Sequence, residues 1–420
     1  MIYQKVKGML DYIENEADKF RYIEKCVTDE IKKHGFREII TPILENTEVF
    51  VHSVGDESDI VTKEMYTFFD KGNRSLTLRP EGTAPVARSY IENKLYSRPS
   101  LTKLYYFGPM FRYERPQAGR YRQFYQFGVE AFGDSSPLLD GDLIYSGYKI
   151  FERLGIKDIV LKINSIGDFL SREAYAIKLR QYFFSYRDRL CEDCQRRLEK
   201  NPLRILDCKV DRNQPYFRTA PKISDSLTPA SRAYFQKALD YLTLLGVSYE
   251  IDYNLVRGLD YYTEIVFEYI YQGDDDFKGL AICAGGKYSN LISDFGGPDI
   301  PGIGYAFGLE RIMALMDRQN LFPALDSGAD IVIIALDELS KEHSLYLANI
   351  LRNRGYRTEI DYYHTTLKPQ FRFAERLNAL FIIIIGEEER INKSITIKNT
   401  KRKTQETIKE EKLLDYLKEH

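Results

Sequence analysis

Residues 111–130 read FRYERPQAGRYRQFYQFGVE, and this stretch decides the fold expected for most of the chain. Two β-prone runs, residues 103–111 and 124–132, flank a loop rich in arginine. Because no helical crossover separates the runs, they predict two antiparallel strands joined by that loop. Arg112 and Glu114 stand two residues apart and so share one strand face, where they could hold a triphosphate and its surroundings. A solvated strand face with ion pairs is the alternative, and spacing alone favours it.

The flanking sequence extends this hairpin into an antiparallel sheet with helices packed on it. Residues 14–34 have apolar positions at steps of three and four, which predicts an amphipathic helix ended by Gly35. The next residues, 36–43, are β-prone up to Pro42. Further strands are expected at residues 65–69, 75–78, 264–271, 280–284 and 302–308, and further helices at residues 84–93, 140–154 and 309–317.

The remaining segments predict an insertion and a second domain. Helical patterns at residues 171–190 and 229–245 predict a helical insertion at about residues 168–245. After the polar turn of Asp326, Ser327 and Gly328, strand-like and helix-like segments alternate regularly, which predicts a separate small α/β domain. We therefore expect a first domain over residues 1–325 and a second domain over residues 330–420.

Composition narrows the class of protein. The 420 residues are 44% apolar and 29% charged, which is typical of a compact folded chain and not of disorder. The net charge is only −2, so any RNA contact must use local patches. No apolar run approaches a membrane span or a signal core, which favours the cytoplasm and no membrane contact. A patch for RNA, or only a solvated turn, could form at Lys398, Lys401, Arg402 and Lys403.

Common nucleotide-binding and hydrolytic motifs are missing. The sequence has no G-x-x-x-x-G-K-[ST] loop, no G-x-G-x-x-G fingerprint, no H-E-x-x-H and no G-x-S-x-G. Cys191, Cys194 and Cys208 lie close together within the predicted insertion. Three thiolates with no histidine nearby fall short of the four ligands of a structural zinc site, so no metal site is expected there.

Three further segments carry residues suited to anions or polar rings. Residues 257–262 (RGLDYY) place an arginine, whose fork suits phosphate oxygens, ahead of two phenols; a β-turn with an exposed arginine is the alternative. Residues 285–288 (GGKY) predict a tight turn that a ligand could approach closely. Residues 302–311 (GIGYAFGLER) lead into a helix, and close packing alone could explain their glycines. Arg311 near the helix start favours a bound anion, because the helix dipole disfavours a cation there.

Together these segments resemble the class II aminoacyl-tRNA synthetases, and in detail the histidyl-tRNA synthetases, across essentially the whole chain. Residues 35–42, 111–130 and 304–311 resemble the first, second and third motifs of the class. Residues 79–83 (RPEGT) and 257–262 resemble the histidine-specific signatures. The resemblance implies an α+β catalytic core with an antiparallel six-stranded sheet flanked by helices, a helical insertion, a C-terminal α/β anticodon-binding domain and a homodimer.

The resemblance also implies a histidine–tRNA ligase that activates L-histidine with ATP and Mg²⁺ and then transfers it to tRNA(His). Arg112 and Arg257 would be catalytic, facing the α-phosphate from opposite sides, and Arg112 would also bridge to the histidine carboxylate. Arg311 would bind the γ-phosphate. Glu114 and Phe124 would lie on the nucleotide side.

A histidine pocket is implied by the same resemblance. Its residues would be Glu81, Thr83 and Gln126 at the ammonium, Glu130 and Tyr262 at the imidazole, and Tyr261 and Tyr288 along the wall, with Arg112 and Arg257 at the carboxylate end. The chain departs from the family pattern at Ala118, Lys287 and Pro369, where a basic residue, an arginine and a lysine are usual. Contacts to ATP and tRNA near these positions are therefore open.

Three other functions are compatible with this fold. A regulatory paralogue would activate the phosphoribosyltransferase of histidine synthesis, but residues 257–262 and 330–420, which such proteins degrade or lack, are both present. A noncatalytic RNA-binding derivative would not need a histidine pocket. A synthetase for another amino acid would not need the two histidine-specific segments.

Overall fold

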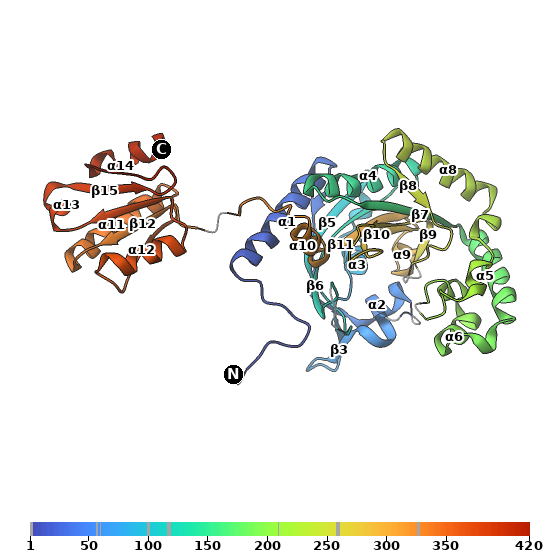
Figure 1. Ribbon diagram of the computed structural model, residues 1–420. Helices are drawn as coiled ribbons and strands as arrows, with labels where there is room; N and C mark the ends of the chain where they lie inside the picture. The colour runs from blue at the N-terminus through green and yellow to red at the C-terminus, as the bar shows by residue number, and fades with distance from the viewer. Residues whose placement is uncertain are drawn as a thin grey trace. The chain divides into compact units, whose positions relative to one another are not determined.

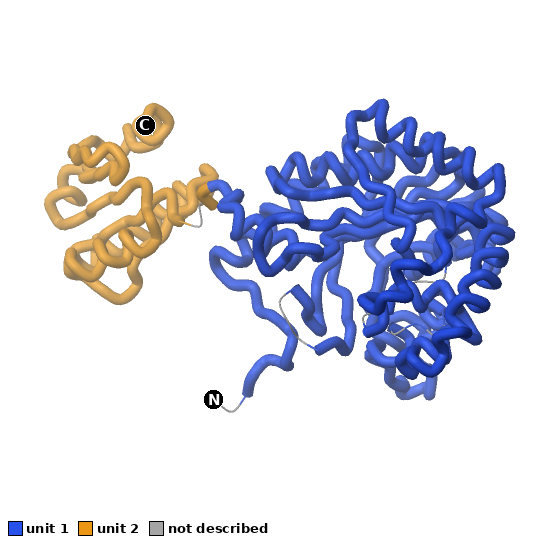
Figure 2. The backbone as a smooth tube through the Cα atoms, turned by 45° about the vertical axis from the view of Figure 1, so that its right-hand side comes forward, with its two compact units in different colours: residues 1–323 blue, residues 324–420 orange. Residues whose placement is uncertain are grey.

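The computed structural model describes residues 3–55, 58, 60–98, 101–115, 119–208, 210–257, 261–325 and 328–420. The chain forms two compact units, Met1–Pro323 and Ala324–His420, each with its own hydrophobic core (Figure 2). None of the helices in the described ranges is long and apolar enough to cross a membrane. Asp326 and Ser327 of the predicted turn lie outside the described residues.

An eight-stranded mixed sheet forms the centre of the first unit, in the order β1-β5-β6-β11-β10-β9-β7-β8 (Figure 1). The inner strands, from β5 to β7 in this order, pair antiparallel, while β1 and β8 pair parallel at the two edges. The antiparallel core is confirmed, but six strands is wrong for the whole sheet because two short edge strands extend it. The strands are β1 (Arg37–Glu38), β5 (Thr102–Phe111), β6 (Gln123–Phe132), β7 (Ile159–Gly167), β8 (Tyr249–Ile251), β9 (Tyr262–Tyr271), β10 (Ala281–Tyr288) and β11 (Gly302–Gly308).

Helices cover both faces of this sheet. The helices whose residues build the larger core against the first face are α1 (Glu14–Lys33), α4 (Pro137–Leu154), α8 (Pro229–Leu244) and α10 (Leu309–Arg318). Those that contribute to the smaller core on the second face are α3 (Thr83–Glu92) and α9 (Leu291–Asp294).

Alternate residues of β6 show how one strand serves both faces. Phe127 and Val129 belong to the larger core, and Phe132 belongs to the smaller one. Because side chains alternate along a strand, Gln126 and Glu130 share the second face with Phe132. The second face therefore combines apolar packing with buried polar groups.

Several segments of the first unit differ from the prediction; residues 285–288, for example, are part of strand β10 and do not form the predicted tight turn. The β-prone residues 36–43 form only the two-residue β1, since Pro42 lacks an N–H for a ladder and the chain turns toward a different sheet. That three-stranded sheet has the order β2-β4-β3 and consists of β2 (Leu44–Asn46), β4 (Ser75–Leu78) and β3 (Tyr66–Phe69), beside α2 (Thr47–Val54). The strand β7 was not predicted, because Asn164 and Ser165 are buried along with its apolar residues and hide the usual alternation.

A helical lobe, residues 169–228, lies between β7 and β8 and is called the insertion lobe below. It contains α5 (Phe169–Phe184), α6 (Glu192–Lys200) and α7 (Pro215–Arg218) around a separate core. The helix predicted at residues 171–190 ends earlier, at Phe184. Asp168 caps α5 by accepting from the Ser171 N–H at 2.8 Å, and Thr228 donates to the same carboxylate at 2.8 Å. These bonds join the start and end of the lobe.

The second unit is a five-stranded sheet in the order β13-β12-β14-β15-β16. Ile331 and Ile333 of its parallel centre pack in one core with α11 and α14, while Val332 and Ile334 pack in another with α12. Burial on both faces explains the continuous apolar runs of the central strands. The elements are β12 (Ile331–Ala335), α11 (Glu338–Asn353), β13 (Thr358–Ile360), α12 (Leu367–Arg376), β14 (Phe381–Ile385), α13 (Glu387–Asn392), β15 (Ser394–Asn399), β16 (Thr404–Lys409) and α14 (Leu413–Glu419).

The basic segment near the C-terminus connects β15 and β16. The backbone N–H groups of Lys401 and Arg402 donate to Asn399 Oδ1 at 3.1 and 3.0 Å. The segment is therefore a hairpin turn stabilised by an asparagine side chain. A contact of its exposed lysines with RNA stays a prediction.

A buried ion pair links the first face of the sheet to its helices. Lys287 of β10 and Asp140 of α4 are 2% and 0% exposed, and Lys287 Nζ lies 3.4 Å from Asp140 Oδ1. Tyr234 of α8 donates to the other carboxylate oxygen at 2.6 Å. Burial raises the pKa of Asp140 to about 6, although Lys287 and Tyr234 oppose the shift. The carboxylate thus depends on both partners to remain charged.

We expect Lys287→Met to lower the free energy of unfolding of the first unit by about 3–5 kcal/mol at pH 8, because it leaves a buried carboxylate without its cation. The double variant with Asp140→Asn should recover part of that loss, since no buried charge remains. Urea unfolding followed by circular dichroism measures both.

Lys162→Met is the matched control. Lys162 pairs with Asp252 at 3.1 Å, but its side chain is 25% exposed, so the variant should lose about 1 kcal/mol or less. Equal losses for the two lysine variants would contradict the importance of burial.

Candidate active site

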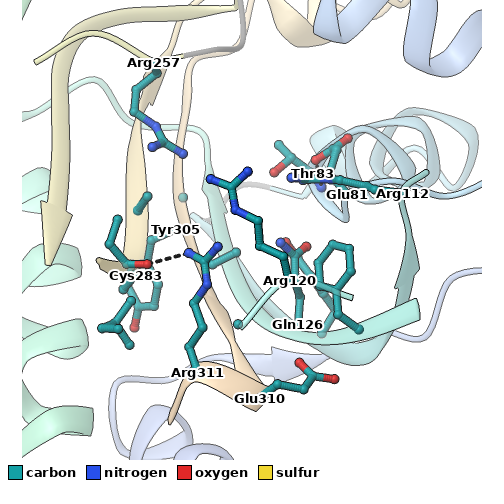
Figure 3. A pocket seen from close by; sticks show the side chains of 18 of the residues that line it. Glu81, Thr83, Arg112, Arg120, Gln126, Arg257, Cys283, Tyr305, Glu310 and Arg311 are labelled. Carbon is teal, nitrogen blue, oxygen red and sulfur yellow. Dashed lines mark hydrogen bonds between the residues drawn. The ribbon is translucent and has the colours of Figure 1, made fainter. Parts of the chain in front are cut away.

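A polar pocket opens on the second face of the sheet in the first unit (Figure 3). Its walls come from β6, β9, β10 and β11 and from the starts of α3 and α10. Segments far apart in the sequence meet here. Every residue predicted to bind histidine or ATP lines it: Glu81, Thr83, Arg112, Glu114, Phe124, Gln126, Glu130, Arg257, Tyr261, Tyr262, Tyr288 and Arg311.

The end of the pocket beside α3 is acidic. Glu81 is 4% exposed, and its carboxylate accepts hydrogen bonds from the backbone N–H groups of Thr83 at 2.6 Å and Ala84 at 2.9 Å. These N–H groups have no partner within the helix, and the helix dipole favours an anion at this position. Burial raises the pKa of Glu81, while the two backbone bonds and Arg112 lower it. The start of α3 therefore fixes Glu81 in the pocket wall.

Glu130 is the second carboxyl group at this end and is 1% exposed. Thr83 Oγ1 donates to one of its oxygens at 2.7 Å, and the Tyr288 hydroxyl donates to the other at 2.6 Å. Burial raises the pKa of Glu130 to about 8, even though both hydrogen bonds lower it. Gly304 of β11 pairs with Glu130, and a Cβ there would lie 1.9 Å from Glu130 Oε2, so only glycine leaves room for the carboxyl group. This carboxyl group exchanges its proton in the same pH range as an imidazole.

Gln126 and two tyrosines complete the acidic end. Gln126 Oε1 is one of the buried side-chain atoms in the described ranges with no hydrogen-bond partner, so an acceptor is left for a ligand. The rings of Tyr261 and Tyr262 lie 4.6 Å apart between centroids, and Tyr261 also contacts Tyr288 at 5.6 Å. A Cβ on Gly286 would come within 2.6 Å of the Tyr262 ring, so this glycine provides the space for the phenol.

Tyr106 is a pocket residue that the sequence analysis missed. It is 3% exposed, and Cβ atoms on Gly82 and Gly128 would lie 2.2 and 2.3 Å from its ring. Tyr106 stands directly opposite Gly128 in the register of β5 and β6. A large ring facing a glycine across an antiparallel pair is the signal that would have identified it.

The other end of the pocket is basic. Figure 3 shows Arg120 and Arg311 turned toward the same space. Arg311 is held in place because its Nε donates to Gly119 O at 3.2 Å and its Nη1 to Ala281 O at 2.6 Å. Burial, followed by the nearby Arg120 and Arg112, lowers the pKa of Arg311 to about 10. Partly buried guanidinium groups that line one end of a pocket are suited to bind a polyphosphate.

Arg112 follows β5 and lies between the two ends. Its Nε donates to Pro80 O at 2.8 Å, and its guanidinium lies 5.3 Å from the centroid of the Phe124 ring. Glu114 accepts from Arg120 Nη1 at 3.2 Å. Arg120, which the sequence analysis placed in a basic loop without a ligand role, is thus part of the pocket.

Arg257 approaches the pocket from the segment before β9. It forms an ion pair with Glu268 of β9, a partner that the sequence analysis did not name. Burial lowers the pKa of Arg257, but Glu268 raises it more, so the guanidinium stays charged. Its Nε is buried and belongs to the described side-chain atoms without a hydrogen-bond partner. The neighbouring residues 258–260, and Gln117 and Ala118 of the basic loop, lie outside the described residues.

Two models of known protein families match this chain. The model described as histidyl-tRNA synthetase matches residues 8–175 and 199–312. The chain belongs to the histidyl-tRNA synthetase family. A second model, described as an anticodon binding domain, matches residues 330–420.

Individual members of the family are similar over the full chain. The histidine–tRNA ligase of Geobacillus sp. (strain WCH70) is 46% identical over 420 residues, which cover 100% of this chain and 99% of that protein. That of Geobacillus kaustophilus (strain HTA426) is 47% identical over 400 residues, covering 95% and 94%. The structure of apo S. aureus histidyl-tRNA synthetase matches with a TM-score of 0.86 and 38% identity, covering 99% of this chain and 100% of that one. The predicted class II synthetase fold is confirmed.

The described departures from the family pattern lie outside the pocket. Lys287 is buried against Asp140, and its Nζ lies 5.3 Å from the centroid of the Tyr234 ring. Pro369 is in the first turn of α12, where helix N–H groups have no partner within the helix and a proline fits. Neither residue changes the lining described above.

The raised pKa of Glu130 predicts a pH dependence of stability without ligands. The proton is bound more tightly in the folded chain, so its stabilising contribution is complete below a pH of about 4.5 and is lost as the pH rises through about 8. We expect the melting temperature of the Glu130→Gln variant to fall less than that of the unchanged protein between these values. Differential scanning calorimetry across the range measures this.

Glu173→Gln, on the exposed surface of α5, is the matched control and should follow the unchanged protein. Glu81 also has a raised pKa and stays in both variants, so some slope should remain. Identical profiles for Glu130→Gln and the unchanged protein would show that Glu130 does not titrate as described.

Proposed function

We propose that the protein is a histidine–tRNA ligase that joins L-histidine to the 3′ end of tRNA(His) with ATP as the energy source. One observation carries the proposal: the pocket has an acidic, phenolic end and an arginine end, and Arg112 lies between them. A zwitterionic amino acid next to a triphosphate needs this order of charges. Membership of the histidyl-tRNA synthetase family supports the same substrates.

At the acidic end, the histidine ammonium would bind Glu81, Thr83 and the unpaired oxygen of Gln126. The imidazole would bind Glu130 and Tyr262, between the rings of Tyr261 and Tyr288. Selectivity would follow because an analogue without ring nitrogens leaves buried polar groups unpaired, which reduces reactivity by about 10⁴–10⁵.

At the arginine end, Arg112 and Arg257 would face the α-phosphate from opposite sides, and Arg311 would bind the γ-phosphate. A histidine carboxylate oxygen attacks the α-phosphorus in line, the bond to the bridging oxygen breaks, and pyrophosphate leaves. Phe124 and Glu114 would lie along the nucleotide. Catalysis then comes from positioning and from guanidinium groups placed where charge develops.

The divalent ion of the reaction is proposed to be Mg²⁺. Such an ion is held mainly by water and substrate phosphates, with one or two carboxylates. Glu114 and Glu310 in the pocket, and Glu268 beside Arg257, are carboxylates at this end that fit that requirement. Mg²⁺ would supply neutralisation of phosphate charge.

In the second step a ribose hydroxyl at the tRNA 3′ end attacks the histidyl carbonyl carbon, and AMP leaves. The second unit would bind the anticodon, as its match to an anticodon binding domain supports. A homodimer and a cytoplasmic location are part of the same proposal and rest on the family resemblance.

Arg257→Ala should reduce histidine-dependent ATP–pyrophosphate exchange by about a hundredfold to a thousandfold, since a preorganised donor at developing charge typically contributes about 2.7–4 kcal/mol. Exchange should require histidine and fail with other amino acids. Arg21→Ala on the solvent side of α1 is the matched control, because its side chain is 73% exposed, and it should keep full exchange.

Other results would redirect the proposal. No exchange from the folded, unchanged protein would favour the regulatory paralogue that activates a phosphoribosyltransferase. Exchange with a different amino acid would favour a synthetase of another specificity. Binding of RNA without any exchange would favour the noncatalytic derivative.

A further inference from the structure

A cluster of four potential metal ligands lies in the insertion lobe, away from the pocket. It consists of Cys191, Cys194, Cys208 and Asp211, whose ligand atoms all lie within 4.8 Å of one another. Cys194, Cys208 and Asp211 are 0%, 4% and 2% exposed. The sequence analysis expected no metal site here because it counted three thiols; the fold adds Asp211 as a fourth ligand.

The backbone around the cluster is arranged as thiolate sites require. Cys191 is the N-cap of α6 and Cys194 lies in its first turn, so the positive end of the helix dipole faces the sulfur atoms. Burial raises the pKa of the Cys191 thiol, the Cys194 amide opposes that shift, and the Asp211 amide donates to Cys208 Sγ at 3.3 Å. N–H groups pointing at sulfur atoms favour the charged thiolate form.

The distance between two of the sulfur atoms fits a shared metal. Cys191 Sγ and Cys208 Sγ are 3.7 Å apart. Two thiolates at about 2.3 Å from one tetrahedral zinc would be about 3.8 Å apart, whereas bonded sulfur atoms are about 2.05 Å apart. Asp211 is held in place because its Oδ2 accepts from the Cys191 N–H at 2.9 Å. All four ligand atoms lie within 4.8 Å of one another, so one ion could contact each of them after small adjustments of the side chains.

We propose that Cys191, Cys194, Cys208 and Asp211 bind one zinc ion, which stabilises the insertion lobe. Thiolates select a soft or borderline cation such as Zn²⁺ over Mg²⁺ or Ca²⁺. Four protein ligands leave no position for a substrate, so the site is structural. The ion would connect the start of α6 to the chain after residue 205. The described residues between 205 and α7 form no helix or strand, so few backbone hydrogen bonds hold this part of the lobe.

The side chains around the cluster make metal binding depend on pH. The lobe core around it is built from aromatic and aliphatic side chains, among them Phe183, Leu198 and Tyr216. Burial raises the pKa of the Cys194 thiol. Zinc would displace the thiol protons, and its binding should strengthen as the pH rises.

The first test is the metal content of the full-length protein purified without chelator from zinc-supplemented medium. We expect one zinc per chain by atomic emission. After removal of the metal, Co²⁺ should produce the intense visible bands of a tetrahedral thiolate site, and zinc should abolish them. Less than about one tenth of a zinc per chain, together with no cobalt bands, would overturn the proposal.

Variants then locate the ion. Cys194→Ser should lose the zinc, and Asp211→Asn should weaken binding by more than the roughly 10–100-fold typical of an outer partner. Cys26→Ser is the matched control, because Cys26 is also a buried free cysteine but lies in α1. Zinc retained by a triple serine variant of the three cysteines would place the metal elsewhere and overturn the proposal.

These outcomes do not depend on aminoacylation, because the readouts are metal content and absorption. If a variant fails to fold, the metal content and cobalt spectrum of the unchanged protein still decide. A disulfide between Cys191 and Cys208 in freshly purified, zinc-grown protein, detected by mass spectrometry, would also overturn the proposal.

Discussion

The Glu130 carboxyl group lies over Gly304 of the neighbouring strand β11, and the geometry of the whole pocket depends on this close contact. Thr83 reaches it from the start of α3, and Tyr288 reaches it from the end of β10, so one carboxyl group connects a helix and two strands. Glycine at position 304 makes this contact possible, because any side chain there would collide with the carboxyl oxygen. The acidic end is thus defined by packing before any ligand binds.

The arginine end has an electrostatic cost that the rest of the fold offsets. Burial, Arg120 and Arg112 lower the pKa of Arg311, while the carboxylates Glu114 and Glu268 raise it. A site organised for an anion is therefore less stable without that anion. The large apolar core on the first face supplies the stability that the pocket lacks.

The sequence predicted those features that depend on local pattern. The arginine-rich hairpin brought Arg112 and Glu114 together, and the family resemblance placed Gln126, Glu130 and Arg311 in the same pocket. The sequence could not show pairs that the chain's path in three dimensions brings together, such as Arg257 with Glu268, or Asp211 with the cysteines. The edge strand β1 is much shorter than the β-prone segment that predicted it, and β7 hides its period by burying polar residues.

The Arg311 side chain is ordered before any phosphate binds, and this reduces the entropy that binding must remove. Its guanidinium is already bound to the carbonyl groups of Gly119 and Ala281. A free arginine side chain carries about 2 kcal/mol of rotamer entropy. Here most of that freedom is lost when the chain folds, so a phosphate meets an ordered donor and need not immobilise one. Affinity at this position is therefore set by the loop that holds Gly119 as much as by the arginine itself.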